Sequence, residues 1–224
     1  MAARIRGQPD SQPHQVTSVG GSFTWPVTLE SGDIVLRPIR YRDRKEWTEL
    51  RSRNCEWLAP WEASNPMPGG GLPDYHQMVR SLKSQAAQGS ALPFVIAEWR
   101  PGHEKPVIVG QLTVSSIVWG SAMMATLGYW VDKDRAGRGI APTAVAMATD
   151  YCFGTLGLHR MEINIRPENG PSLRVVEKLG FRDEGFRPRF LHINGQWADH
   201  RTFALTAEEV PEGLLARWLR SRPA

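Results

Sequence analysis

The chain has 224 residues, with 27 Lys and Arg against 23 Asp and Glu, which gives a formal net charge of +4 at pH 7. Its hydrophobic fraction of 41% and charged fraction of 22% are ordinary for a globular domain, and no apolar run reaches the roughly 18 residues of a transmembrane helix, so we expect no membrane span. The first residues lack the apolar core of a secretory signal and the two cysteines form no motif, which excludes a disulfide-rich secreted protein and predicts a cytoplasmic one.

The N-terminal part of the chain predicts a tail, a strand and a helix. Residues 1–20 are rich in Gln, Pro, Ser and Gly and have no periodicity, so we expect a disordered tail before a single domain over residues 21–224. A strand is expected at 33–40. Asp43 is placed to cap the helix that follows, which is expected to run as far as Leu58.

The loop after this helix, residues 57–66, carries Trp57, Trp61 and Glu62. Two aromatic rings and one carboxylate suit the wall of a substrate site. Alternatively, the two tryptophans simply pack beneath the loop, and the sequence leaves both interpretations open. A second helix is expected near residues 75–88.

The middle of the chain predicts strands that lead into a helix. Two antiparallel strands are expected at 92–99 and 107–118, joined by a turn containing Pro and Gly. A third strand at 123–131 delivers the chain to the loop RAGRGIA at 135–141. The apolar segment 142–156 then predicts a nearly buried helix, with a proline tolerated in its first turn.

The loop at 135–141 therefore joins a strand to a helix through two glycines. The N–H groups at a helix N-terminus have no earlier carbonyl partner and lie at the positive end of the helix dipole, so they suit a phosphate or pyrophosphate. Gly137 and Gly139 remove side chains where a backbone must approach a ligand closely. The loop lacks the Lys of a P-loop and the third glycine of a dinucleotide-binding fingerprint.

This loop resembles the acetyl-CoA pyrophosphate loop of the GCN5-related N-acetyltransferases (GNAT), written Gln or Arg, x, x, Gly, x, Gly or Ala. Ala136, Gly139 and Ala141 occupy its register, with Ala136 in place of the usual Gln or Arg. Backbone amides make the phosphate contact, so the departure leaves the mechanism in place. The alternative is a glycine turn that only precedes a core helix.

A second signature follows. Residues 160–166 alternate apolar and polar side chains, which predicts a strand with one buried face. The segment 167–172 comes next, and then an amphipathic helix that Gly180 is placed to end. The string is similar to the second GNAT signature, Glu-Asn-x-x-Ser followed by Glu-Lys-Leu-Gly-Phe. Together the two signatures cover residues 127–181.

Segments on either side narrow the resemblance. They are IVLRP at 34–38, WLAPWE at 57–62, and NGQW at 194–197 followed by Asp199 and His200. These segments are similar to the RimJ and RimL group of ribosomal-protein N-terminal acetyltransferases, and most similar to actinobacterial RimJ-like proteins.

The resemblance implies a GNAT fold of the α/β (α+β) class, with a central mixed, mostly antiparallel twisted sheet of about seven strands flanked by helices. Two neighbouring strands, near Trp130 and Ile163, would splay apart to bind acetyl-CoA. The residues themselves predict strands at 182–193 and 197–205 around Asn194-Gly195, a strong hairpin signal. A closing amphipathic segment at 209–222 covers the sheet or contacts a second subunit, so we expect a monomer or homodimer.

The resemblance also implies acetyl-CoA as co-substrate. Its pantetheine arm would pair with the backbone of Trp130 and Val131, its diphosphate would lie on the loop amides, and Asn169 would orient the thioester arm. The residues expected to bind the cofactor are Trp130, Val131, Arg138, Gly139, Ile140, Ala141, Thr143, Asn169 and Ser172.

Ser172 is the expected acid. It matches the position whose hydroxyl, in RimL-like members, protonates or stabilises the departing CoA thiolate. The other common acid is a tyrosine one helical turn later, where this chain has Val176. Ser172 is also placed to cap the helix, and the two roles compete for the same oxygen.

The acceptor amine must lose a proton. An N-terminal amine has a pKa about 2.5 units below that of lysine, so it needs a weaker base. Glu62, Glu162 and Asp199 are carboxylates on segments expected to line the cleft, and each is a candidate base that works directly or through water. Each also has a structural alternative, which for Asp199 is a pairing with a nearby Arg or support of the hairpin.

These features predict an acetyl-CoA-dependent transferase that acetylates the N-terminal α-amine of a protein, for example a ribosomal protein. Two alternatives stay open: an acetyltransferase of a small-molecule amine, and a non-catalytic acyl-CoA-responsive or ribosome-assembly factor. A cleft lined with several acids favours a polyamine or aminoglycoside, and an open groove favours a peptide. The histidines show no metal-ligand spacing and the arginines are scattered, so we expect no metal and no nucleic-acid partner.

Overall fold

The computed structural model describes residues 4–6, 17–18, 21–22, 24–67 and 73–222. Its centre is a nine-stranded sheet in the order β1-β4-β5-β6-β7-β8-β9-β11-β10, and β2 and β3 form a separate pair. Neighbours in the large sheet are antiparallel except β8 with β9. The strands are β1 (Arg4–Arg6), β2 (Thr17–Ser18), β3 (Gly21–Ser22), β4 (Thr28–Ser31), β5 (Ile34–Pro38), β6 (Leu92–Glu98), β7 (Val107–Val118), β8 (Met124–Val131), β9 (Arg160–Ile165), β10 (Arg182–Ile193) and β11 (Gln196–Thr206).

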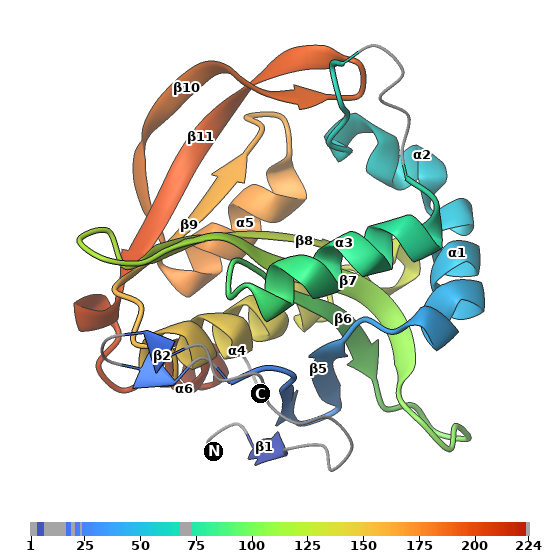
Figure 1. Cartoon of the computed structure of the whole chain (residues 1–224), viewed down its shortest axis with the longest axis horizontal. Coiled ribbons are helices and arrows are strands. Elements are labelled where there is room, and N and C mark those ends of the chain that lie inside the picture. The colour runs from blue at the N-terminus through green and yellow to red at the C-terminus, as the bar shows by residue number, and fades with distance from the viewer. Residues whose placement is uncertain (1–3, 7–16, 19–20, 23, 68–72, 223–224) are drawn as a thin grey trace.

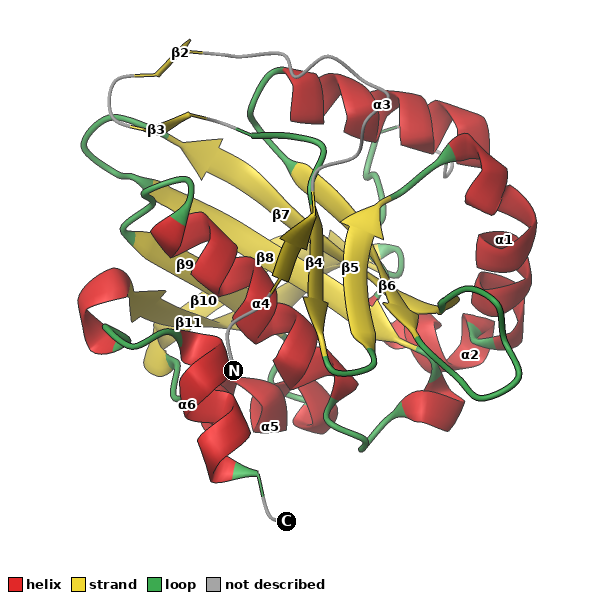
Figure 2. Cartoon of the chain, turned by 90° about the horizontal axis from the view of Figure 1, so that it is seen from below, coloured by secondary structure: helices red, strands yellow, loops and turns green. Residues whose placement is uncertain are grey.

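Helices cover both faces of this sheet (Figure 1, Figure 2). They are α1 (Arg44–Arg53), α2 (Cys55–Leu58), α3 (Tyr75–Ala87), α4 (Ile140–Gly154), α5 (Gly170–Leu179) and α6 (Leu214–Ser221). Strand β6 shows how one sheet serves two cores. Phe94 and Ile96 point into the large core with α4, α5 and α6, while Val95 points into the smaller core with α1 and α3. Within the described ranges, no helix is long and apolar enough to cross a membrane.

Strands β8 and β9 run together for only a short distance. Their parallel pairing covers Met124 to Thr126 on β8, and no β9 partner follows. Strand β8 stays paired with β7 as far as Val131, so its other edge is left open beside the loop that leads to α4. The splayed central strands that the resemblance implies are therefore present.

The β10–β11 hairpin reaches across to the segment after α2 (Figure 1). Asn194 and Gly195 form its two-residue loop with φ of 46° and 84°, the left-handed values that a type I′ turn requires. Ala63 forms an isolated bridge with Ile193, and the Ser64 N–H donates to the His192 carbonyl at 2.9 Å. The hairpin tip thus holds the loop that carries Glu62.

The fold confirms most predicted elements and changes several boundaries. The helix expected to continue to Leu58 breaks at Asn54 into α1 and α2. Asp43 does not cap α1 with its side chain; its carboxylate instead accepts from the Arg40 N–H at 2.9 Å and pairs with Arg37 at 2.7 Å. The sheet exceeds seven strands because β1 and β4 extend the edge beyond β5. Most of the expected tail, residues 1–3, 7–16 and 19–20, lies outside the described residues.

Candidate active site

A cavity of about 770 Å³ lies where β8 parts from β9. One end is lined by the end of β8, the glycine loop and the start of α5, and the other by α1, α2 and the turn after them. Successive side chains of β8 point to opposite faces of the sheet. Tyr129 and Val131 therefore lie on the face covered by α4 and α5, and Trp130 lies on the face covered by α1 and α3. The cavity therefore connects the two faces of the sheet through the gap between the strands.

The glycine loop forms the first end. Gly137 and Gly139 have φ of 80° and 78°, and Gly139 is the N-cap of α4. A Cβ on Gly139 would also lie 3.4 Å from the Trp218 ring of α6. Gly139, Ile140 and Ala141 line the cavity, so the free N–H groups of the first turn of α4 are beside it. This arrangement fits a diphosphate.

Two residues expected to bind the cofactor do not line this cavity. Arg138 is an exposed residue of the loop and does not line the cavity. Thr143 is buried, and its hydroxyl donates to the Gly139 carbonyl at 2.8 Å and accepts from Trp218 Nε1 at 2.9 Å. Thr143 therefore holds the loop against α6 through its side chain.

Asp132, directly before the loop, is buried and fixes the end of β8. Its carboxylate accepts from Arg53 at 2.7 Å and from Asn54 Nδ2 at 2.9 Å. Burial acts to raise the pKa of Asp132, but the hydrogen bonds from Arg53 and Asn54 outweigh burial and leave the pKa below its ordinary value. The ionised carboxylate thereby anchors the loop to the joint between α1 and α2.

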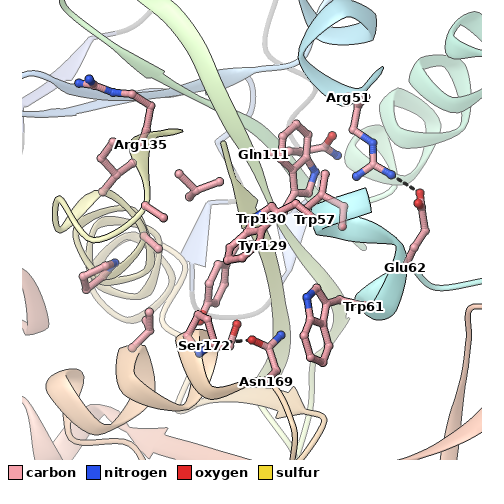
Figure 3. Close-up of a pocket in the computed structure, with 18 of the residues that line it drawn as sticks. Arg51, Trp57, Trp61, Glu62, Gln111, Tyr129, Trp130, Arg135, Asn169 and Ser172 are labelled. Atoms are coloured by element: carbon pink, nitrogen blue, oxygen red, sulfur yellow. Dashed lines mark hydrogen bonds and ion pairs between the residues drawn. The ribbon is translucent and has the colours of Figure 1, made fainter. Parts of the chain in front are cut away.

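The start of α5 brings Asn169 and Ser172 to the cavity wall (Figure 3). Asn169 is the N-cap, and its side-chain oxygen accepts from the Ser172 N–H at 3.1 Å. The capping role that competed for the Ser172 hydroxyl is therefore filled by Asn169. Ser172 keeps its hydroxyl for the cavity, while the amide of Asn169 is partly committed to the helix.

Tyr129 is a neighbour of Ser172 that the sequence did not single out. Its ring runs from β8 toward Ser172 (Figure 3). Burial raises the pKa of the Tyr129 phenol, with an opposing influence from the Ser172 hydroxyl. The phenol oxygen is buried, and it forms no hydrogen bond of normal geometry with any residue in the described part of the chain.

The second end of the cavity is built around an ion pair between Arg51 and Glu62 (Figure 3). The Arg51 guanidinium lies 5.6 Å from the ring centroid of Trp47 and 5.1 Å from that of Trp130. Trp47 is fixed in turn, because its Nε1 donates to Gln111 Oε1 at 2.9 Å. Trp57 and Trp61 also line the cavity, so both are part of its wall. Trp57 lies in α2 and not in the loop expected over 57–66, and Trp61 ends the short 3₁₀ turn that follows α2.

Of the three candidate bases, Glu62 lines the cavity and the other two lie elsewhere. Glu162 is buried on the face of β9 opposite Ile163, where it pairs with Arg160 at 2.7 Å and Arg187 at 3.7 Å. Asp199 is exposed on β11 and accepts from the Arg189 N–H at 2.7 Å. Both carboxylates support the β9–β11–β10 part of the sheet.

A family model described as the acetyltransferase (GNAT) domain matches residues 33–182. The chain belongs to the GNAT acetyltransferase family. Together with the cavity at the β8–β9 split, the match makes this GNAT protein an acetyl-CoA-dependent N-acetyltransferase. Acetyl-CoA is its co-substrate. Trp130, Val131 and the glycine loop line the cavity.

Relatives place the chain in the RimJ- and RimL-like branch of the family. Mycobacterium smegmatis RimJ, solved with CoA-disulfide, is 38% identical with a TM-score of 0.76 over 84% of this chain and 88% of its own. The Escherichia coli ribosomal protein uS5 alanine N-acetyltransferase is 29% identical over 84% of this chain and 94% of its own. The Bacillus subtilis protein named "Probable N-acetyltransferase YjcK" is 40% identical over 79% of this chain and 96% of its own.

Proposed function

We propose that this GNAT protein transfers the acetyl group of acetyl-CoA to the N-terminal α-amine of a protein, with a ribosomal protein as the first acceptor to test. We further propose that residues 21–224 act as one acetyltransferase domain. The acceptor named for the E. coli relative, ribosomal protein uS5, and the likeness to M. smegmatis RimJ support this choice.

The charge of the acceptor end is the observation that carries the proposal. Glu62 is the only carboxylate among the described residues that line the cavity, and Arg51 already pairs with it. The remaining cationic lining residues, Arg135, Arg174 and Lys178, lie at the other end of the cavity, on the glycine loop and α5. A polyamine or aminoglycoside carries several positive charges and needs several acids, so this lining favours an acceptor with a single amine.

The aromatic wall supports a peptide. Four tryptophans, Trp47, Trp57, Trp61 and Trp130, line the cavity. Flat indole faces provide apolar surface for the first side chain of a peptide and an electron-rich surface for its ammonium group. The cavity therefore suits a single terminal amine that is attached to apolar groups.

In the reaction, the neutral amine nitrogen attacks the thioester carbonyl carbon and the carbon–sulfur bond breaks. Glu62 is the base that the geometry favours, because it lines the cavity and Glu162 and Asp199 do not. It takes the amine proton directly or through one water, once the amine has displaced it from Arg51. Ser172, on the opposite wall, stabilises the charge that develops on the departing sulfur.

The test is the release of CoA from acetyl-CoA with short peptides that carry different free N-termini, beside a panel of polyamines, amino acids and aminoglycosides. Turnover on a free peptide that disappears when its N-terminus is blocked supports the proposal. Turnover on small amines alone moves the protein to the small-molecule class. Mass spectrometry of the peptide product separates α-amine from lysine acetylation.

A further inference from the structure

The Tyr129 hydroxyl is a buried polar group in the cavity wall, and the Ser172 hydroxyl acts on it. The phenol oxygen forms no hydrogen bond of normal geometry with any described residue. The hydroxyls of the buried Tyr75 and Tyr151 differ from it: Tyr75 donates to the Arg40 carbonyl at 2.7 Å, and Tyr151 donates to the Thr24 carbonyl. A buried hydroxyl left unpaired is unfavourable, and phenylalanine would fill the same space without that cost. The hydroxyl therefore points to a role in the site.

Its position is fixed by the strand split. Tyr129 follows Thr126, the last β8 residue paired with β9, so its ring stands where the sheet opens. The ring packs on the α4 and α5 side of the sheet and runs toward Ser172 (Figure 3). The backbone of Ser172 is held by the Asn169 cap, so the Ser172 hydroxyl is the movable partner of this pair.

We propose that Tyr129 is a positioning residue whose hydroxyl donates a hydrogen bond to Ser172 Oγ and so directs the Ser172 proton at the thioester sulfur. This inference rests on the proposed function, in which Ser172 faces the leaving group. A serine hydroxyl alone rotates among several orientations. A fixed donor to its oxygen leaves the serine proton free to point into the cavity and polarises the O–H bond.

The step needs no proton transfer from tyrosine. When the carbon–sulfur bond breaks, its electron pair goes to sulfur, and Ser172 donates a hydrogen bond to the developing thiolate. Tyr129 remains protonated, consistent with a phenol whose pKa burial raises. The proton that sulfur finally takes comes from water, and the acceptor amine gives its own proton to Glu62 or water.

The test compares Tyr129→Phe, Ser172→Ala and the double variant, with Tyr151→Phe as the matched control. Phenylalanine keeps the ring and removes one oxygen in each tyrosine variant. We expect Tyr129→Phe to lower kcat about tenfold, the loss of one ordinary hydrogen bond, with KM for acetyl-CoA and Kd for CoA changed by less than about twofold. Tyr151→Phe is expected to keep wild-type kcat, because its hydroxyl bonds away from the cavity.

The double variant separates positioning from general support of the fold. If Tyr129 acts through Ser172, its removal in the Ser172→Ala background lowers kcat no further. The inference is overturned if the two single variants lower kcat by factors that multiply in the double variant. It is also overturned if Tyr129→Phe keeps full kcat. Either result leaves the proposed function standing. Failure of the wild-type protein to acetylate any peptide overturns the proposed function instead.

A crystal structure of the protein with bound CoA tests the contact between Tyr129 and Ser172 directly, without any activity measurement. The inference requires the Tyr129 oxygen within about 3.2 Å of Ser172 Oγ. A Tyr129 hydroxyl that bonds to water or to another group in that complex overturns it.

Discussion

Asn54 and Asp132, 78 residues apart in the chain, form a buried hydrogen bond at 2.9 Å that joins the two ends of the cavity. Asn54 Nδ2 is the donor, and Asn54 Oδ1 accepts from the Lys133 N–H at 2.9 Å. Asn54 lies at the break between α1 and α2, and Asp132 lies between β8 and the glycine loop. One amide side chain thus holds the α1–α2 end of the cavity in register with the glycine loop.

Replacement of this amide should weaken both the fold and the site. We expect Asn54→Ala to lower the free energy of unfolding by about 2 to 3 kcal/mol, because it leaves the buried Asp132 carboxylate and the Lys133 N–H short of a partner. Urea denaturation measures the change. Asn65→Ala is the matched control, since Asn65 is exposed and its side chain accepts from the Met67 N–H. Equal losses of unfolding free energy in Asn54→Ala and Asn65→Ala would contradict the stabilising role given to the Asn54–Asp132 hydrogen bond.

The buried Asp132 carboxylate should make the stability of the protein depend on pH. Hydrogen bonds from Arg53 and Asn54 outweigh burial and lower the pKa of Asp132 on folding. A carboxyl with a lowered folded pKa stabilises the protein fully above its unfolded pKa of about 3.9, and this contribution is lost as pH falls through the folded pKa. Stability of the wild type should therefore decline below about pH 4 more steeply than that of Asp132→Asn. Denaturation midpoints at a series of pH values test this, and parallel curves would refute it.

Gly139 allows a comparison between two glycines with the same backbone strain. Gly139 and Gly102 have φ of 78° and 79°, so alanine at either position costs roughly 1 to 2 kcal/mol of stability. Gly139→Ala should also weaken CoA binding about tenfold, because the shifted loop loses a hydrogen bond to the diphosphate. Gly102→Ala should retain wild-type affinity, since Gly102 lies away from the cavity. Titration calorimetry with CoA measures both, and equal affinities would place the diphosphate elsewhere.

Glu62→Gln tests the base. The change keeps the shape of the side chain and removes the group that accepts a proton, so kcat/KM for the peptide should fall about a hundredfold while CoA affinity stays unchanged. Glu56→Gln is the control, because Glu56 is exposed on α2 and does not line the cavity. Full activity in Glu62→Gln would assign proton removal to water alone.

Much of the cofactor end was predictable because it is encoded locally. Alternating residues gave the strands, and Gly137 and Gly139 marked the loop before α4. The Asn194-Gly195 turn was likewise readable, since both residues adopt the left-handed conformation that a type I′ hairpin needs. Sequence periodicity reports which side of an element is buried and where it ends, and these features depend on little else.

The acceptor end was decided by tertiary structure. Glu62, Glu162 and Asp199 were equivalent candidates in the sequence, and only the packing of α1, α2 and the β10–β11 hairpin brought Glu62 to the cavity. The partnership of Asn54 with Asp132 carried no local signal. The sequence by itself determined the family, the fold and the position of the glycine loop, because these follow from short-range pattern. Contacts between distant segments decided which side chains line the other end of the cavity. Local sequence periodicity carries no information about such contacts.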